Sequence, residues 1–186
     1  MPRLYRNRHD AYRVYMRYAF VQDFALTMAF TIFMVYLVRL LELDPFHMVL
    51  VGTALEAAAF LFEIPTGVVA DVYSRRLSVI IGLLLLGAGF IIFGLTTVFG
   101  VILASQVIAG IGFTFISGAA TAWLSDEIGE AQANRALLRG AQVGTVGSIA
   151  GIVVGVALAL WSLALPIVLA GVILLLLALY LTLFMP

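Results

Sequence analysis

Long apolar segments separated by short polar stretches make up most of this chain. Six of them are close to the length of about 20 residues that a helix needs to cross the hydrocarbon core of a bilayer. They lie at residues 18–40, 46–70, 78–98, 100–124, 140–161 and 163–185. Apolar residues surround each predicted helix instead of forming one stripe, which argues against amphipathic helices on a soluble core. The pattern predicts an all-α membrane protein with six transmembrane helices, preceded by an arm at residues 1–17.

The composition narrows the class of protein further. Hydrophobic residues make up 64% of the chain and charged residues 11%, whereas soluble domains are about half apolar and a quarter charged. The chain has no cysteine, which excludes disulfides, thiolate metal sites and cysteine nucleophiles. His9 and His47 fall on opposite sides of the predicted membrane, and the sequence shows no phosphate-binding loop or nucleophile arrangement. We therefore predict that the protein is not an enzyme and uses no cofactor or metal ion.

The arginines give the predicted bundle an orientation. Six spans place the arm, the loop after span two, the loop after span four and the C-terminus on one side. Of the ten basic residues, only Arg39 lies on the other side. Because positive residues stay in the cytoplasm, we predict a multi-pass protein of the cell membrane (inner or plasma) with both termini cytoplasmic. The cytoplasmic arginines are Arg3, Arg6, Arg8, Arg13, Arg17, Arg75, Arg76, Arg135 and Arg139.

The N-terminal arm mixes its arginines with tyrosines, which allows two interpretations. A basic and aromatic arm is one form of RNA-binding segment. The same residues also suit a short interfacial helix, with rings at the headgroup level and positive charge toward anionic lipid. We favour the interfacial helix, so the predicted partner is the lipid bilayer and not a nucleic acid. The tyrosines are Tyr5, Tyr12, Tyr15 and Tyr18.

The loop after span two carries the most informative motif. It reads Gly67-Val-Val-Ala-Asp71-Val-Tyr-Ser-Arg75-Arg76. Gly67 allows another helix to approach closely. Asp71 is placed to cap or pair at a helix end, and the two arginines supply charge and hydrogen-bonding forks. This combination predicts a tight, charged connection between two spans.

This loop resembles the signature between the second and third helices of the major facilitator superfamily. The family pattern is Gly-x-Leu-Ala-Asp-Arg-x-Gly-Arg-Lys/Arg. The residues that match it are Gly67, Ala70, Asp71, Arg75 and Arg76, and those that depart from it are Val69, Val72 and Ser74. The preceding segment 62–66, Phe-Glu-Ile-Pro-Thr, is also similar to bacterial members.

The resemblance implies a secondary transporter that moves a small solute by alternating access. Members have twelve helices in two six-helix halves around a central cavity, and each half consists of two inverted three-helix units. The length of this chain suits the N-terminal half, as a fragment or truncated gene that lacks its C-terminal half, or as a subunit that pairs with a second copy. The alternatives are a non-transporting membrane scaffold or assembly protein and an inactive truncated remnant. A channel is disfavoured, because no apolar stretch remains for a re-entrant pore segment.

Acidic residues at the end of span four predict a cytoplasmic charge cluster. Asp126 and Glu127 oppose the macrodipole at a helix C-terminus, so they need cations nearby. Arg75 and Arg76 lie on the same predicted side of the membrane. We therefore expect an ion pair between these two groups, as in the family's conformational-switch loop; the alternative is that all four are solvated loop charges. The resemblance also implies that Asp71 faces a helix of the second half.

Three carboxylates fall inside the apolar segments. Asp23, Glu56 and Glu63 would each cost about 2.5–3.5 kcal/mol at the bilayer centre, so they are predicted to face protein or water. Glu56 and Glu63 are seven residues apart and share one helix face. These acids are candidates to carry a coupling proton or to attract a cationic substrate. A structural role is the alternative, for Asp23 near a helix N-terminus and for Glu63 next to the break at Pro65.

Two further features concern spans four and five. Gln106 stands where proton-driven exporters of the family often carry an arginine, which weakens an assignment as a proton antiporter. The cavity is expected between spans one, two, four and five. Glycines recur every four residues in span five, at Gly147, Gly151 and Gly155, and small residues do so in span four, at Gly110, Thr114 and Gly118. The family's antiporter motif ends in Gly-Pro, but Val156 follows Gly155 here, so we predict simple helix packing.

Overall fold

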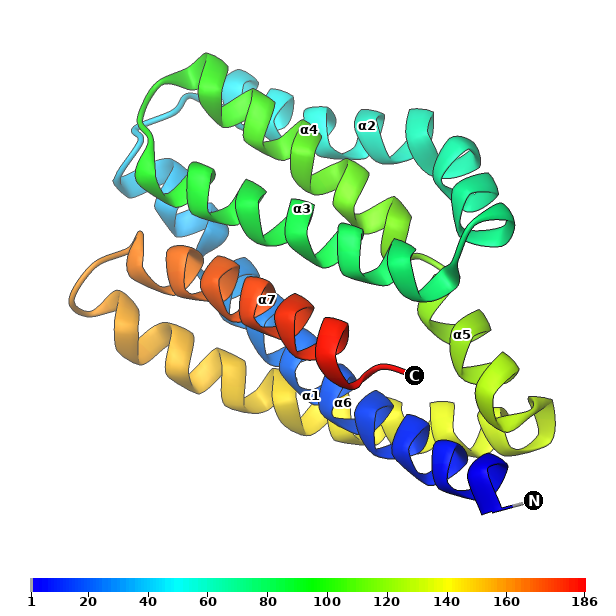
Figure 1. The fold of residues 1–186 in the computed structure, drawn as a ribbon. Helices are drawn as coiled ribbons and strands as arrows, with labels where there is room; N and C mark the ends of the chain where they lie inside the picture. The colour runs from blue at the N-terminus through cyan, green and yellow to red at the C-terminus, as the bar shows by residue number, and fades with distance from the viewer. Residues whose placement is uncertain (1) are drawn as a thin grey trace.

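The computed structural model describes the backbone of residues 2–186 and the side chains of residues 11–186, and all of its regular structure is helical (Figure 1). Six helical stretches are long and apolar enough to cross a membrane, which confirms the six-span prediction. The side chains of Arg3, Tyr5, Arg6, Arg8 and His9 lie outside the described residues. The helices are α1 (Pro2–Arg39), α2 (Pro45–Val72), α3 (Arg75–Leu95), α4 (Phe99–Ile116), α5 (Ala119–Ile128), α6 (Glu130–Ala159) and α7 (Leu165–Phe184).

Two helices extend beyond the apolar segments that predict them. Residues 2–17, expected as a separate arm, continue directly into the first span as part of α1. Helix α6 begins at Glu130, ten residues before the expected residue 140, after Gly129 turns the chain with a φ of 83°. Hydropathy detects only the part of a helix that suits lipid. A polar extension of the same helix leaves no apolar signal.

The fourth span is a broken helix and not the single continuous one expected over residues 100–124. Helix α4 ends at Ile116 and α5 begins at Ala119, so the span runs Phe99–Ile128 with an interruption. Gly118 adopts a φ of 73° at the break, a conformation that residues with a Cβ rarely adopt. No atom of the described residues lies within 4 Å of a Cβ placed there. Gly118 therefore permits the break and does not extend the packing stripe of Gly110.

The packed helix pairs form a pattern with internal symmetry (Figure 1). The main contacts join α1 with α6, α2 with α4, α3 with α7, α3 with α4, and α1 with α7. Exchanging α1 with α4, α2 with α6 and α3 with α7 maps α1·α6 onto α2·α4 and α1·α7 onto α3·α4, and it maps α3·α7 onto itself. Two inverted three-helix units predict this arrangement. At its centre Gly87 of α3 and Gly171 of α7 face each other, and a Cβ on either would meet the carbonyl oxygen of the other at 2.8 or 2.6 Å.

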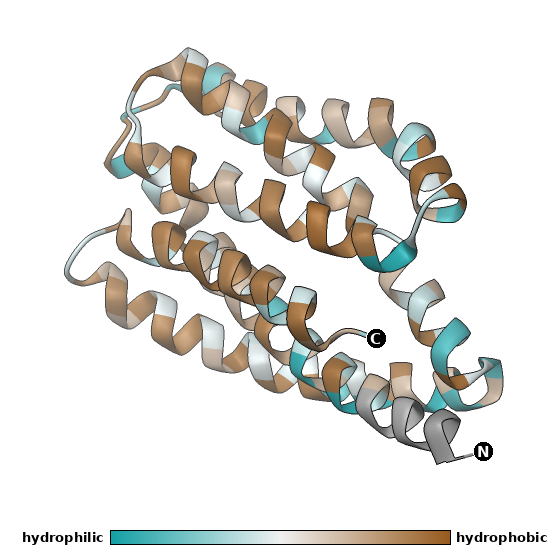
Figure 2. Ribbon diagram, viewed as in Figure 1, coloured by the Kyte–Doolittle hydropathy of each residue, from teal (hydrophilic) through white to brown (hydrophobic). Residues whose placement is uncertain are grey.

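One end of the bundle gathers most of the polar residues. Both termini, the α2–α3 loop and the α5–α6 turn lie at this end (Figure 1). Hydrophilic colour also concentrates there, while the lengths of the helices are mostly apolar (Figure 2). We refer to it as the basic end, because Arg75, Arg76, Arg135 and Arg139 lie on these segments.

The helices differ in how much of their surface the rest of the chain covers. In the most apolar part of α3, 61% of residues are buried, whereas in α2 only 11% are. Helix α2 packs mainly on α4, and it shares almost no direct contact with α1 within the described residues. A cleft therefore remains between α1, α2 and α4.

Candidate functional site

The first candidate site is an ion-pair cluster at the basic end. Ser74 caps α3 by accepting a hydrogen bond from the backbone N–H of Leu77 at 3.2 Å. This cap starts α3 at Arg75 and directs that side chain toward α5. The Arg75 Nη1 donates to both carboxylate oxygens of Asp126 at 2.7 Å and to the Ala122 carbonyl at 3.3 Å. The ion pair expected between the two loops is therefore present.

Asp71 and Arg76 make different contacts around this pair. The Oδ1 atom of Asp71 lies 3.5 Å from Arg75 Nη2, which is a long contact across the short connection between α2 and α3. Arg76 donates to the Thr182 carbonyl oxygen at 2.7 Å, one of the carbonyls that a helix C-terminus leaves free. A cavity of 480 Å³ at the basic end is lined by Asp71, Arg75 and Asp126 and also by Glu127. Glu127 forms no ion pair with any residue whose side chain is described. Arg75 thus joins α2, α3 and α5, while Arg76 ties α3 to α7.

Gly67 does not have the packing role expected from the motif. Within the described chain, no atom lies within 4 Å of a Cβ placed at Gly67. Gly67 therefore leaves an open surface on α2, and no described helix of this chain packs against it.

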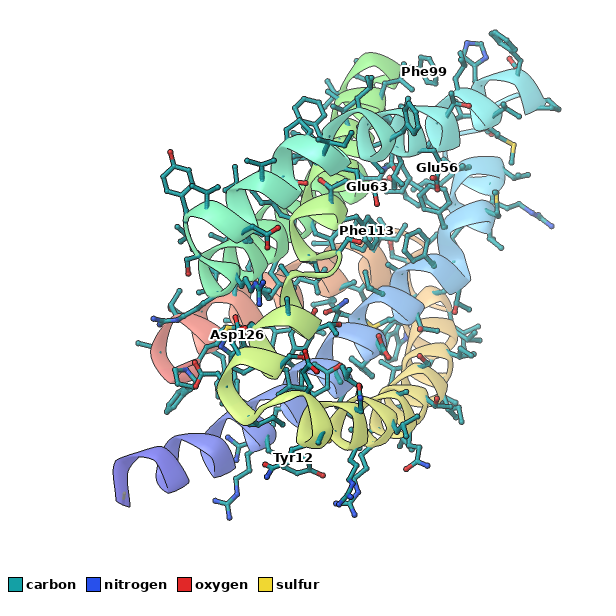
Figure 3. The ribbon with its side chains drawn as sticks, turned by 90° about the vertical axis from the view of Figure 1, so that its right-hand side faces the viewer. Tyr12, Glu56, Glu63, Phe99, Phe113 and Asp126 are labelled. Carbon is teal, nitrogen blue, oxygen red and sulfur yellow. The ribbon has the colours of Figure 1, made fainter. Side chains whose placement is uncertain are left out.

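The second candidate site is the cleft between α1, α2 and α4. It consists of two adjoining cavities of 380 and 500 Å³ that share Glu56, Ala59 and Phe113. The first cavity also contains Gln106, and the second contains Glu63. The expectation that Glu56 and Glu63 share a face therefore fits the structure, and both point from α2 toward the space beside Phe113 (Figure 3).

Asp23 lies apart from the two glutamates. It lines a separate cavity of 240 Å³ with Tyr15 and Tyr18 at the α1–α6 side of the bundle. Its carboxylate sits over Gly144, where a Cβ would overlap it. The neighbouring Gln22 lines both this cavity and the larger cleft cavity. The structure therefore groups Glu56 with Glu63 and places Asp23 in a separate cavity nearer α6.

Gln106 is the most unusual polar residue of the cleft. Its side chain is fully buried, yet neither its amide oxygen nor its amide nitrogen has a hydrogen-bond partner among the residues that the structure describes. Leaving such a group unpaired costs about 1–3 kcal/mol. An amide that keeps both its donor and its acceptor free at a cavity wall is available to a bound molecule.

Proline and threonine shape α2 next to Glu63. Pro65 lies inside the helix and lacks the N–H that would continue the backbone ladder. The buried Thr66 hydroxyl donates to the Phe62 carbonyl at 2.7 Å and to the Glu63 carbonyl at 3.2 Å. The hydroxyl therefore gives two carbonyls of the turn around Pro65 an additional donor, and α2 curves toward the basic end (Figure 1).

The glycine stripe of α6 packs against α1. A Cβ at Gly147, Gly151 or Gly155 would meet the carbonyl oxygen of Phe20, Phe24 or Met28, respectively. The two backbones therefore approach closely over three turns, as small-residue stripes permit. This geometry agrees with packing as the reason for the spacing.

Sequence reasoning missed the aromatic wall of the cleft. Phe30 and Phe33 of α1 line the cavity that contains Glu56 and Gln106. Phenylalanine is common in every span, so nothing in the pattern distinguishes these rings. Among the residues with described side chains, no group of three or more histidines or acids is arranged to hold a metal ion.

Comparison with known proteins adds the family. A search of curated proteins found no match. The family model described as the Major Facilitator Superfamily matches residues 18–186, which include all six spans, the charged loop and the cleft. Together with the inverted-repeat packing, this match means that the chain belongs to the major facilitator superfamily.

Proposed function

We propose that this chain forms the N-terminal half of a secondary transporter, which moves a small solute by alternating access through the α1–α2–α4 cleft. A second six-helix half, or a second copy of the chain, completes the cavity. The basic end faces the cytoplasm. Asp23, Glu56, Glu63 and Gln106 are the candidate groups for the solute or a coupling proton.

The exposed carboxylates of α2 carry this proposal. Glu56 and Glu63 both lie on an exposed face of a helix that crosses the membrane, and neither has an ion-pair partner among the described residues. Against lipid, each would cost about 2.5–3.5 kcal/mol. A water-filled cavity between two halves removes that cost. The same cavity explains why α2 is so little covered by its own chain.

The ion-pair cluster supplies a movable connection for the same cycle. Arg75 reaches from α3 to Asp126 on α5 and to Asp71 on α2, across segments joined by loops. These pairs are partly exposed, and such pairs are worth about 0–1 kcal/mol. A contact of this strength can open and close during a transport cycle. We propose that Gly67, Asp71, Arg75, Arg76, Asp126 and Glu127 form this switch.

Reconstitution of the full chain into proteoliposomes tests the proposal. Uptake of a panel of solutes is measured with and without a proton gradient, for the wild type and for Arg75→Gln and Asp126→Asn. We expect saturable uptake by the wild type and slower uptake by both variants. Saturable uptake that responds to pH in the wild type but not in Glu56→Gln would assign Glu56 as the proton carrier. Folded chain that moves no solute of the panel would instead favour the scaffold or inactive alternatives.

The absence of native cysteine makes the orientation directly testable. Glu42→Cys places a thiol in the α1–α2 loop, and Glu130→Cys places one at the start of α6. In intact cells, a membrane-impermeant maleimide should label only Glu42→Cys. Permeabilised cells should label both variants. Labelling of Glu130→Cys in intact cells would reverse the proposed orientation.

A further inference from the structure

The cleft combines three kinds of side chain that together restrict its ligand. Its two cavities, of 380 and 500 Å³, fall within the range of about 300–1,000 Å³ typical of small-molecule sites. Carboxylates come from α2, aromatic rings from α1 and α4, and a buried amide from α4. Each group favours a different part of a ligand.

The charge of the cleft is entirely negative. Glu56 lies in both cavities and Glu63 in one, and no arginine or lysine is among the described residues that line either cavity. The described ion-pair cluster at Arg75 engages Asp71 and Asp126 instead. An anionic ligand would be repelled, and a neutral one would gain nothing from the charge of the carboxylate. A cation provides the missing partner.

Aromatic rings form the wall opposite Glu56. Phe30 and Phe113 lie with their ring centroids 6.3 Å apart and nearly parallel, and Phe33 lines the same cavity. Ring faces attract cations through their quadrupole and also accept a flat apolar body. This wall therefore suits an organic cation better than a metal ion, which takes about six oxygen ligands and would find only the Glu56 carboxylate and the Gln106 amide as acidic or amide side chains among the described residues of this cavity.

Gln106 gives an independent indication of a bound molecule. It is fully buried in the wall of the first cavity with both amide atoms unpartnered. A ligand that carries an N–H or O–H group can donate to its amide oxygen. A ligand acceptor can receive a hydrogen bond from its amide nitrogen. A ligand that forms these hydrogen bonds removes the free-energy cost of leaving the buried amide without partners, and this favours binding.

From these groups we propose that the cleft binds organic cations with an aromatic or apolar body, held by Glu56, the phenylalanine wall and Gln106. This inference rests on the proposed function, because it names the substrate class of the same cavity. Glu63 extends the negative surface from Glu56 toward the basic end.

Binding of two probes that differ in the sign of their charge tests the proposal. Tetraphenylphosphonium and tetraphenylborate have nearly the same size and apolar surface, and neither titrates. Equilibrium binding to the purified full chain in detergent is compared with binding to empty micelles. We expect tetraphenylphosphonium to bind saturably and tetraphenylborate to bind no more than it does to micelles. Equal binding of both probes, or no saturable binding of the cation by folded protein, would overturn the proposal.

Variants locate the charge and the amide. Glu56→Gln should weaken tetraphenylphosphonium binding by at least about tenfold, the scale of losing one charge partner. Glu42→Gln changes an exposed acid outside the cleft and should leave the affinity unchanged. Gln106→Leu should spare tetraphenylphosphonium, which has no N–H, and weaken 4-phenylbutylammonium, which has three. An unchanged affinity in Glu56→Gln would refute the assigned site.

Transport by the chain and cation binding in the cleft can fail separately. If proteoliposomes accumulate neutral or anionic solutes and Glu56→Gln does not affect this, the chain transports but the substrate class is wrong. If tetraphenylphosphonium binds through Glu56 but proteoliposomes move no solute, the cation site stands and the transport proposal fails. Circular dichroism and monodisperse elution in detergent verify that each variant is folded.

Discussion

The α1·α6 pair and the α2·α4 pair occupy equivalent places in the two inverted units, yet they are built differently. Along α1·α6, the glycines of α6 lie against successive carbonyls of α1. In α2·α4, Gly110 of α4 meets α2 closely at the Leu55 carbonyl, but one turn earlier α4 carries Gln106 and one turn later Phe113. The first pair is sealed along its length. The second pair also packs along its contact, most closely where Gly110 meets the Leu55 carbonyl, and the cleft opens beside it toward α1.

This difference shows how one topology provides both a rigid wall and a binding surface. Small residues let two backbones approach and leave no room for a ligand. Larger side chains on the matching face hold the helices apart and present polar groups in the gap. In this chain the acids Glu56 and Glu63 belong to the open pair. Substitutions in the sealed α1·α6 pair and in the open α2·α4 pair should therefore have different effects.

Filling the glycine stripe should have the largest effect. Any Cβ at Gly151 would overlap the Phe24 carbonyl oxygen. Gly151→Leu therefore forces α1 and α6 apart, and overpacking of this kind typically costs about 1–3 kcal/mol. We expect a clear fall in Tm by circular dichroism in detergent, or loss of folded protein.

Gly100→Ala is the matched control for the glycine stripe. No atom of the described chain lies within 4 Å of a Cβ placed at Gly100 in α4. Alanine is the better helix former by up to about 1 kcal/mol, so Tm should stay constant or rise. Equal losses in Gly151→Leu and Gly100→Ala would mean that the stripe does not hold the pair together.

Removing the unpaired amide should shift stability in the opposite direction. Gln106→Leu replaces a fully buried side chain without hydrogen-bond partners by an apolar one of similar size. Relief of that desolvation should raise the free energy of unfolding by about 1–2 kcal/mol. The comparison is Gln142→Leu at an exposed position of α6, where a change within about 0.5 kcal/mol is expected. A destabilised Gln106→Leu would show that the amide has a structural role in the open pair.

The Arg75–Asp126 ion pair should contribute less. The side chain of Arg75 is 33% exposed and that of Asp126 is 60% exposed, so solvent screens the interaction. A double-mutant cycle with Arg75→Gln and Asp126→Asn should give a coupling of no more than about 1 kcal/mol. The variants should slow transport much more than they lower Tm. A coupling of several kcal/mol would make the cluster a fixed structural brace instead of a switch.

The sequence predicts the number of spans, because apolar length and arginine placement report directly on the bilayer. It also predicts an ion pair between Arg75 or Arg76 and Asp126 or Glu127, since the segments that carry them fall on one side of an even-numbered bundle. The packing decides that Arg75 pairs with Asp126. It does not predict the α4–α5 break, because Ser117 and Gly118 lie within a continuously apolar stretch. The turn at Gly118 depends on a local φ that hydropathy does not register.

The sequence identifies the acids of the cleft but not their grouping. Glu56 and Glu63 share a helix, so a spacing of seven places them on one face. Asp23 is on another helix, and its rotation about the α1 axis is set by the glycine stripe of α6. That rotation turns Asp23 toward Gly144 and away from the two glutamates. Relations between helices therefore require the packing, whereas relations within one helix follow from the spacing.

The smallest predicted effect concerns the end of the open pair opposite the basic end. Asp44 caps α2 by accepting hydrogen bonds from the backbone N–H groups of His47 and Phe46 at 3.1 and 2.9 Å. It also contacts His47 Nδ1 at 2.6 Å, and the His47 ring packs edge-on against Phe99 of α4. The polar contact holds the His47 ring at the start of α2, and the contact of that ring with Phe99 connects α2 to α4 where no glycine stripe does. The sealed α1·α6 pair holds its backbones together without any such cap.

The cap should make the open pair sensitive to acid. The hydrogen bond from the His47 backbone N–H, assisted by the His47 side chain, lowers the pKa of Asp44 below its ordinary value. A group whose pKa is lower when folded stabilises the protein above its unfolded pKa, about 3.9 for aspartate, and this contribution is lost as the pH falls through the folded pKa. Wild-type Tm should therefore fall slightly more below about pH 4 than that of Asp44→Asn, which keeps a capping oxygen without a titrating charge. Glu42→Gln should follow the wild-type curve. If Asp44→Asn followed it as well, the end of the open pair would depend on the packing of His47 against Phe99 and not on the charge of Asp44.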